Sequence, residues 1–209
     1  MALDTVRHAN VAQTRERLVV HEEIKDCRRC TFCFNGNGPV PYYGPTPNDI
    51  MILGDAPTRT DDRQGVITFK GDPGLLLRQI LAAADLDLDR LFYANAISCW
   101  PEAGVPDRNL LACAPNLRRL VALCDPILVL ALGSTALKVA SDRKGRTITR
   151  DHGVPFRARA GPFRERWVFP TWHPAALKHR SNANAGTALR ADILTFAEFY
   201  RGLKEEAPF

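Results

Sequence analysis

The sequence predicts an α/β fold in which a parallel sheet carries helices on both faces. Three short apolar runs support this prediction, because each is typical of a strand buried on both sides: IMILG at 50–54, LFYANAI at 91–97 and ILVLAL at 127–132. Segments with apolar residues at helical spacing separate these runs. Strands that alternate with helices along a chain build parallel sheets covered on both faces.

The other elements follow from local patterns. Residues 5–26 are polar and amphipathic, which predicts an N-terminal helix, and the stretch that follows the first cysteines is dense in Gly, Pro and Asn, which predicts irregular structure. The segment GDAPTRTDDRQG after the first strand is expected to be a loop. We further expect helices over 74–86, 109–123 and 187–203, a helix start at 133–135, and a hairpin within 145–170 that leads into a strand at 167–172.

Length and composition favour one globular domain. With 209 residues and 45% apolar residues, we expect residues 1–26 to form a helix packed on a single domain of residues 27–209. Apolar runs stay well below the roughly 18 residues of a membrane span, and the polar N-terminus lacks the apolar core of a signal peptide. We therefore expect a cytoplasmic protein, in which clustered cysteines favour metal or redox chemistry over disulfides.

The positive charge is concentrated in one part of the chain. The net charge is +5, and residues 141–180 hold ten Lys or Arg against three acidic residues. A one-sided basic surface is typical of a protein that binds a polyanion such as nucleic acid. A solvated, arginine-rich loop is the alternative.

Two pairs of cysteines form a candidate metal centre. Cys27 and Cys30 have C-x-x-C spacing, and thirteen residues separate Cys99 from Cys113. Four thiolates suit either a [4Fe–4S] cluster or a tetrahedral zinc, and the spacing alone does not decide between them. Ordinary buried cysteines are the alternative, and Cys33 could replace Cys30 because these two also form a C-x-x-C.

The predicted fold indicates where a ligand would bind. In open α/β sheets, ligands bind beyond the carboxyl ends of the strands. This rule selects the loop after Gly54, the surroundings of Asn95 and the turn at Gly133.

In chain order, the motifs CRRC, GDAPTRTDDRQG, ITFKGDPG, YANAISC, ALGSTA and PTWHPAALKHR resemble those of the iron–sulfur uracil-DNA glycosylases, often called family 4. The six motifs keep the family's order and near-equal spacing over roughly residues 27–200. The resemblance implies a three-layer α/β/α sandwich around a four-stranded parallel sheet. It implies a monomeric DNA repair enzyme that hydrolyses the N-glycosidic bond of deoxyuridine in single- or double-stranded DNA, releasing uracil. It also favours a [4Fe–4S] cluster held by Cys27, Cys30, Cys99 and Cys113 over zinc.

Three side chains match the chemistry of uracil recognition. A glycosylase must take its base out of the stack and read it in a pocket. The ring of Phe69 is suited to stack on the base, and the amide of Asn95 can donate to O4 and accept from N3–H, a pattern that cytosine reverses. His173 can donate to O2, where negative charge develops on the departing uracil.

The loop after the first strand departs from the family's pattern. By resemblance, the backbone at Gly54 and Ala56 contacts uracil, and the acid Asp55 orients or activates water. The family usually has glutamate at the position of Asp55 and glycine at that of Thr58, so the rate and the base range are open here. The acids at 61–62 either help to position water or belong to a solvated loop.

Several residues are candidates for contact with the DNA itself. By resemblance, Leu177 is the apolar side chain that fills the space left by the flipped base. Lys178 and Arg180 suit phosphates, as do the amides at the helix start of Ser134 and Thr135.

Three other functions remain open at this point. Asp55 and Thr58 are compatible with a glycosylase for another deaminated or modified base. A non-catalytic iron–sulfur reader of DNA would need no acid in the pocket, so the full set of pocket residues argues against it. A zinc-stapled nucleotide-binding module is the third alternative.

Overall fold

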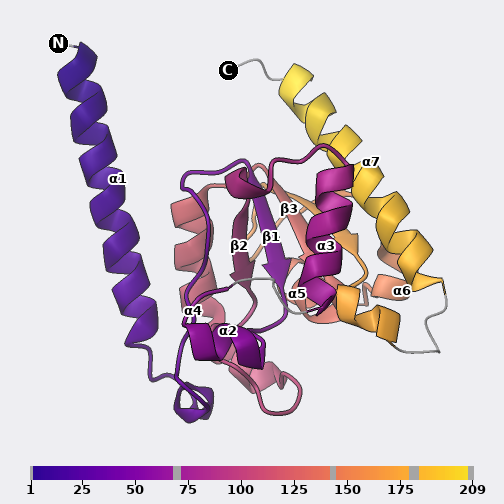
Figure 1. Cartoon of the computed structure of the whole chain (residues 1–209), viewed down its shortest axis with the longest axis horizontal. Helices are drawn as coiled ribbons and strands as arrows, with labels where there is room; N and C mark the ends of the chain where they lie inside the picture. The colour runs from indigo at the N-terminus through magenta and orange to yellow at the C-terminus, as the bar shows by residue number, and fades with distance from the viewer. Residues whose placement is uncertain (1, 68–71, 142–144, 179–183, 207–209) are drawn as a thin grey trace.

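The computed structural model describes residues 2–67, 72–141, 145–178 and 184–206, and it forms a sheet with helices on both faces (Figure 1). The strands are β1 (Ile50–Gly54), β2 (Phe92–Asn95), β3 (Leu128–Leu132), β4 (Phe156–Arg157) and β5 (Trp167–Thr171). The helices are α1 (Ala2–Lys25), α2 (Arg59–Gln64), α3 (Asp72–Ala83), α4 (Asp107–Cys124), α5 (Gly133–Ala140), α6 (Ile148–Asp151) and α7 (Ala185–Glu206), and short 3-10 turns are η1 (Thr31–Phe34), η2 (Leu88–Arg90) and η3 (Pro174–Lys178).

The sheet has the strand order β2-β1-β3-β5-β4. The first four of these strands are mutually parallel, which confirms the expected four-stranded parallel sheet. The short strand β4 pairs antiparallel with β5 and adds an edge that the family resemblance did not predict.

Two hydrophobic layers enclose the sheet. Side chains alternate between the faces of a strand, so Met51 and Leu53 of β1 pack into a layer with α1, α4 and α5. Ile50 and Ile52 pack on the opposite face with α3 and α7. The three-layer α/β/α sandwich is therefore confirmed. In the part of the chain that the structure describes, no helix combines the length and apolarity that crossing a membrane requires.

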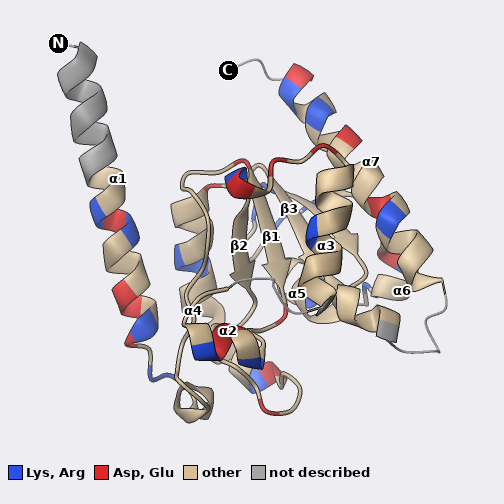
Figure 2. Cartoon of the chain, viewed as in Figure 1, with Lys and Arg blue, Asp and Glu red and all other residues tan. Residues whose placement is uncertain are grey.

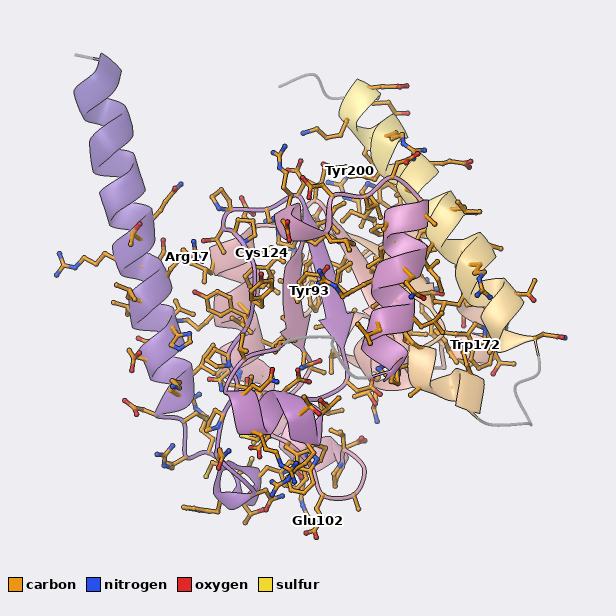
Figure 3. The ribbon with its side chains drawn as sticks, viewed as in Figure 1. Arg17, Tyr93, Glu102, Cys124, Trp172 and Tyr200 are labelled. Carbon is orange, nitrogen blue, oxygen red and sulfur yellow. The ribbon has the colours of Figure 1, made fainter. Side chains whose placement is uncertain are left out.

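The C-terminal half of α1 packs on the sandwich, while its start projects away from the sheet (Figure 1). Val20 and Ile24 are buried in the layer that includes α4. Arg17 reaches the sandwich (Figure 3) and donates to the carbonyl of Gly44 at 3.2 Å, and its own carbonyl accepts from the hydroxyl of Tyr42 at 3.1 Å. The predicted N-terminal helix is thus present.

The segment expected to be a loop after β1 contains the helix α2. Thr58 begins it with a capping box: its hydroxyl accepts from the Asp61 amide at 3.2 Å, and the Asp61 carboxylate accepts from the Thr58 amide at 2.9 Å. Asp62 is also buried and accepts from the amide of Asn37 at 2.8 Å. The solvated-loop interpretation of these two acids is therefore wrong, because both hold backbone amides.

The predicted hairpin within 145–170 is shorter than expected. The helix α6 occupies its first part, and strand pairing between β4 and β5 is limited to Phe156 with Val168 and Arg157 with Trp167. The turn residues read from the sequence include Gly153, which follows α6 with a φ of +73°.

The arginines of the β4–β5 connection lie at the amino end of the sheet, because β5 runs parallel to β3 and begins beside its start. Arg166 is paired with Asp125, and Arg157 and Arg164 lie 3.7 and 3.8 Å from Glu165. Along α1 and α7, positive and negative side chains are interspersed (Figure 2). The arginines of the β4–β5 connection are thus not at the carboxyl end of the sheet.

Candidate active site

A pocket of about 360 Å³ opens at the carboxyl ends of the parallel strands, where the sequence analysis placed the ligand. Its volume lies within the range of roughly 300–1,000 Å³ that is usual for small-ligand sites. Apolar walls come from Ala56, Pro57, Trp100, Pro101 and Val105. Its polar side chains are Asp55, Thr58, Asp61, Asn95 and His173.

Strand register places Asp55 beside Asn95. Gly54, the last residue of β1, is paired with Asn95, the last residue of β2. The pairing continues beyond the strands, because the amides of Ala96 and Ile97 donate to the carbonyls of Gly54 and Asp55 at 2.9 and 3.2 Å. The two side chains therefore enter the same pocket from neighbouring strand ends.

Gly133 lets a third element approach the same point. It begins α5 with a φ of +81°, a conformation that residues with a side chain rarely adopt. A Cβ atom at this position would lie 2.8 Å from the Cβ of His173 and 3.7 Å from Oδ1 of Asp55. The absence of a side chain thus brings β3, the loop after β1 and the loop after β5 together.

The start of α5 holds the carboxylate of Asp55. Asp55 accepts hydrogen bonds from the Ala136 amide and the Thr135 hydroxyl, while its Oδ1 is buried with no hydrogen-bond partner among the described residues. Burial is the largest influence and raises the pKa of this carboxyl above its ordinary value of 3.8, whereas His173 and the two donors act to lower it. One oxygen is therefore anchored and the other is free for a ligand or a water molecule.

The ring of His173 is oriented by its own loop. The amide of Ala175 donates to Nδ1 at 3.1 Å, so Nδ1 is an acceptor and the proton of the neutral ring is on Nε2. Burial lowers the pKa of this imidazole below 6.5, although the nearby Asp55 carboxylate opposes the shift. The neutral ring can then offer the N–H of Nε2 as a hydrogen-bond donor.

The structure describes Ser134, Thr135 and Leu177 among the residues predicted for DNA contact, and these three lie at different places. The Thr135 hydroxyl is bonded to Asp55, and Ser134 beside it is exposed at the start of α5. Leu177 is half-buried in η3 and lies close to Gly186 of α7, where an added Cβ would be 3.4 Å from its Cδ2. Phe69, Arg180 and the side chain of Lys178 lie outside the described residues.

Sequence reasoning missed Trp100 as part of the pocket. Its ring forms a wall, and the guanidinium of Arg59 lies over it at 4.3 Å from the ring centre. The amide of Asn35 reaches the Trp100 carbonyl at 3.5 Å. The available signal was position alone, since Trp100 directly follows the candidate ligand Cys99.

The four candidate cysteine ligands are near enough to influence one another electrostatically. Cys99 and Cys113 are buried, and the amide of Ser98 donates to the sulfur of Cys113 at 3.4 Å. Burial raises the pKa of both thiols. Neighbouring thiols raise it further, in the order Cys113, Cys30, Cys27 and Cys33 for Cys99, and Cys27 then Cys30 for Cys113. Of these thiols, Cys33 has the smallest influence on the pKa of Cys99. Cys124 lies apart in the α4 layer.

In the described ranges, no three His, Cys, Asp or Glu side chains are arranged closely enough to hold one metal ion. A tetrahedral zinc needs its sulfur ligands at about 2.3 Å from a single point. The four thiols come from the C-x-x-C turn, the loop after β2 and the first half of α4.

The α/β/α sandwich and the polar pocket at the carboxyl ends of its strands define an α/β protein with a small-ligand site at the edge of its sheet. Residues 41–196 match the Uracil DNA glycosylase superfamily, and the chain belongs to this family. It is similar to the Type-4 uracil-DNA glycosylase of Thermotoga maritima, with 30% identity over 81% of this chain and 88% of the relative. Proteins with the same description from Sulfurisphaera tokodaii (28% identity, 78% of this chain and 76% of the relative) and Pyrobaculum aerophilum (29%, 76% and 82%) are similar as well.

Proposed function

We propose that the chain is a DNA repair enzyme that hydrolyses the N-glycosidic bond of deoxyuridine in DNA, releases uracil and leaves an abasic site. The convergence of Asp55, Asn95 and His173 in one pocket carries this proposal. The relatives described as Type-4 uracil-DNA glycosylases support it.

The three side chains have complementary tasks. The amide of Asn95 donates to O4 of uracil and accepts from N3–H, so cytosine would leave buried polar groups unpaired, at a cost of about 1–3 kcal/mol for each group. The Nε2–H of His173 donates to O2, where charge accumulates as the bond breaks. A neutral imidazole serves this task, because Nε2–H remains a donor while the buried pocket avoids a further charge.

Asp55 is the residue that handles water. Its buried, unpartnered Oδ1 can accept from a water molecule, while the anchored oxygen keeps the carboxylate fixed at the start of α5. Aspartate is one methylene shorter than the family's glutamate, but its carboxylate lines the same pocket as His173 and interacts with it electrostatically. The reaction is dissociative: the bond to the departing uracil breaks first, and water held by Asp55 then adds to the sugar.

The cysteine group fits a [4Fe–4S] cluster held by Cys27, Cys30, Cys99 and Cys113. Burial raises the pKa of the Cys99 and Cys113 thiols, so they would bind as thiolates only beside a cationic centre, a charge that iron would supply. The segment between the last two ligands contains Trp100 and Val105 of the pocket wall. The cluster would hold this wall in place, so its role is structural.

The location and the assembly state follow from the same reasoning. Reduced thiols fit a cytoplasmic protein that acts on uracil-containing DNA. A monomer is expected from the family resemblance.

A glycosylase assay tests the proposal. The protein, purified without oxygen, is incubated with a single-stranded oligonucleotide that contains one deoxyuridine, and alkali then reveals abasic sites as strand breaks. Asn95→Ala should lose the cleavage, whereas Asn48→Ala, at the amino end of the same sheet, should keep it. No cleavage by the wild type, with DNA still bound, would refute the uracil activity. A glycosylase for another base or a non-catalytic reader would then be favoured.

A further inference from the structure

A second polar groove lies between the end of α1 and the middle of α4, away from the base pocket. It has a volume of about 600 Å³, and its charged and polar lining residues are Glu23, Arg29, Asn116, Arg118 and Arg119. Glu23 is the acid among the described lining residues, and it is paired with Arg119. The guanidinium charges of Arg29 and Arg118 therefore remain in excess in the groove.

The amide of Asn116 is buried in this groove with its donor unused. Its side chain is on a residue that is 4% exposed, and Arg29 donates to Oδ1 at 2.6 Å, which fixes the orientation of the amide. A reversed amide would face the guanidinium with its NH₂ group, so the free atom is Nδ2. Nδ2 has no hydrogen-bond partner among the described residues. A buried donor without a partner costs about 1–3 kcal/mol, so a ligand with acceptor oxygens is favoured here.

The groove adjoins the cysteine group. The same guanidinium nitrogen of Arg29 lies 3.7 Å from the sulfur of Cys27, and Asn116 is three residues after Cys113 on α4. The end of α1 and the turn that carries Arg29 lie near α2, at the end of the molecule where β1 points (Figure 1). The groove therefore lies toward the same end of the sheet as the base pocket.

We infer that this groove binds a phosphate group of the DNA backbone, with Arg29, Arg118 and Nδ2 of Asn116 as donors. Two guanidinium groups and an amide N–H match the acceptor oxygens of a phosphate. Neither Arg29 nor Asn116 belongs to the base pocket, so the contact would add affinity without reading the base. The inference assumes that the protein acts on DNA, and it is independent of which base is removed.

Salt dependence of DNA binding tests the inference. Each phosphate contact to single-stranded DNA contributes about 0.7 to the slope of log K against log salt. Arg118→Ala should reduce the steepness of the slope by about that amount and weaken binding equally for oligonucleotides with and without uracil. Arg15→Ala removes the same charge from the neighbouring α1–α4 groove, which offers no orphan donor among its described residues, and should leave the slope unchanged.

A second measurement separates DNA from a free anion. Inorganic phosphate, compared with chloride at equal ionic strength, should raise the melting temperature of the wild type. Asn116→Asp keeps the acceptor for Arg29 but removes the Nδ2 donor, so it should abolish this rise. The absorbance near 400 nm shows in each variant that the cysteine centre is intact.

The combined outcomes decide the inference. If Asn116→Asp abolishes the rise in melting temperature with phosphate, and Arg118→Ala reduces the salt slope by about one contact, the groove is a DNA phosphate site. Loss of the phosphate effect with an unchanged slope for Arg118→Ala overturns the assignment to DNA and leaves a site for a free oxyanion. If neither quantity changes in the variants, the groove binds no phosphate and the inference is wrong. Failure of uracil excision would not affect these binding measurements, so the two proposals fail separately.

Discussion

Gly133→Ala is expected to separate catalysis from DNA binding. The alanine methyl group would lie 2.8 Å from the Cβ of His173, which is about 0.6 Å inside an ordinary van der Waals contact of 3.4 Å. His173 or the start of α5, which holds Asp55, must move by about this distance. Because a misplacement of about 1 Å can lower a rate by 10²-fold, we expect kcat to fall about ten- to fifty-fold. KM for DNA should change less than kcat because, of the proposed DNA contacts, only those at the start of α5 and after His173 lie close to the substitution, whereas the groove at Arg29 and Arg118 lies elsewhere.

The same substitution also strains the backbone, and this effect needs its own control. A side chain at positive φ costs about 1–2 kcal/mol, which lowers the melting temperature of a protein this size by about 2–8 °C. Gly161 has a similar φ of +78°, against +81° at Gly133, with nothing within 4 Å of an added Cβ. Gly161→Ala should therefore lose similar stability while keeping kcat. Single-turnover excision kinetics and thermal unfolding measure both quantities. Full activity of Gly133→Ala, or an equal loss of kcat in both variants, would refute the reasoning.

Three further predictions concern pH, the cysteine centre and the support of the His173 loop. Excision requires ionised Asp55, and burial raises the pKa of this carboxyl above its ordinary value of 3.8. The excision rate should therefore be retained above the raised pKa and lost as the pH falls through it. A pH–rate profile that stays flat down to pH 3.8 would contradict this. Cys99→Ser should lose the absorbance near 400 nm and lower the melting temperature, whereas Cys33→Ser should keep the absorbance. Loss of the absorbance in Cys33→Ser but not in Cys99→Ser would make Cys33 the ligand. Asp192 is buried and accepts from the hydroxyl of Thr171 at 2.7 Å and from the ring of His152 at 3.0 Å near the end of β5. Asp192→Leu leaves both donors without this partner and should destabilise the protein by about 1–3 kcal/mol in urea unfolding. An unchanged unfolding midpoint would show that this network is not needed.

Much of the fold follows from apolar patterns alone. The runs at 50–54 and 127–132 are apolar throughout because they are buried on both faces, and such strands can be recognised from sequence. The helix α2 was missed because its six residues, RTDDRQ, are polar. Burial of Asp61 and Asp62 depends on a partner distant in the sequence, Asn37, and on the cap at Thr58, and no local pattern of apolar residues records it.

In the pocket, too, some features follow from the sequence and others depend on the tertiary structure. The sequence by itself determined which side chains stand at the strand ends, so Asp55 and Asn95 could be chosen from the rule that ligands bind there. Only the tertiary structure decided that Thr135 serves Asp55, that Trp100 forms a wall, and that Gly133 admits His173. Local sequence encodes backbone propensity and burial, whereas these contacts join strands and loops far apart in the chain and depend on register and close approach.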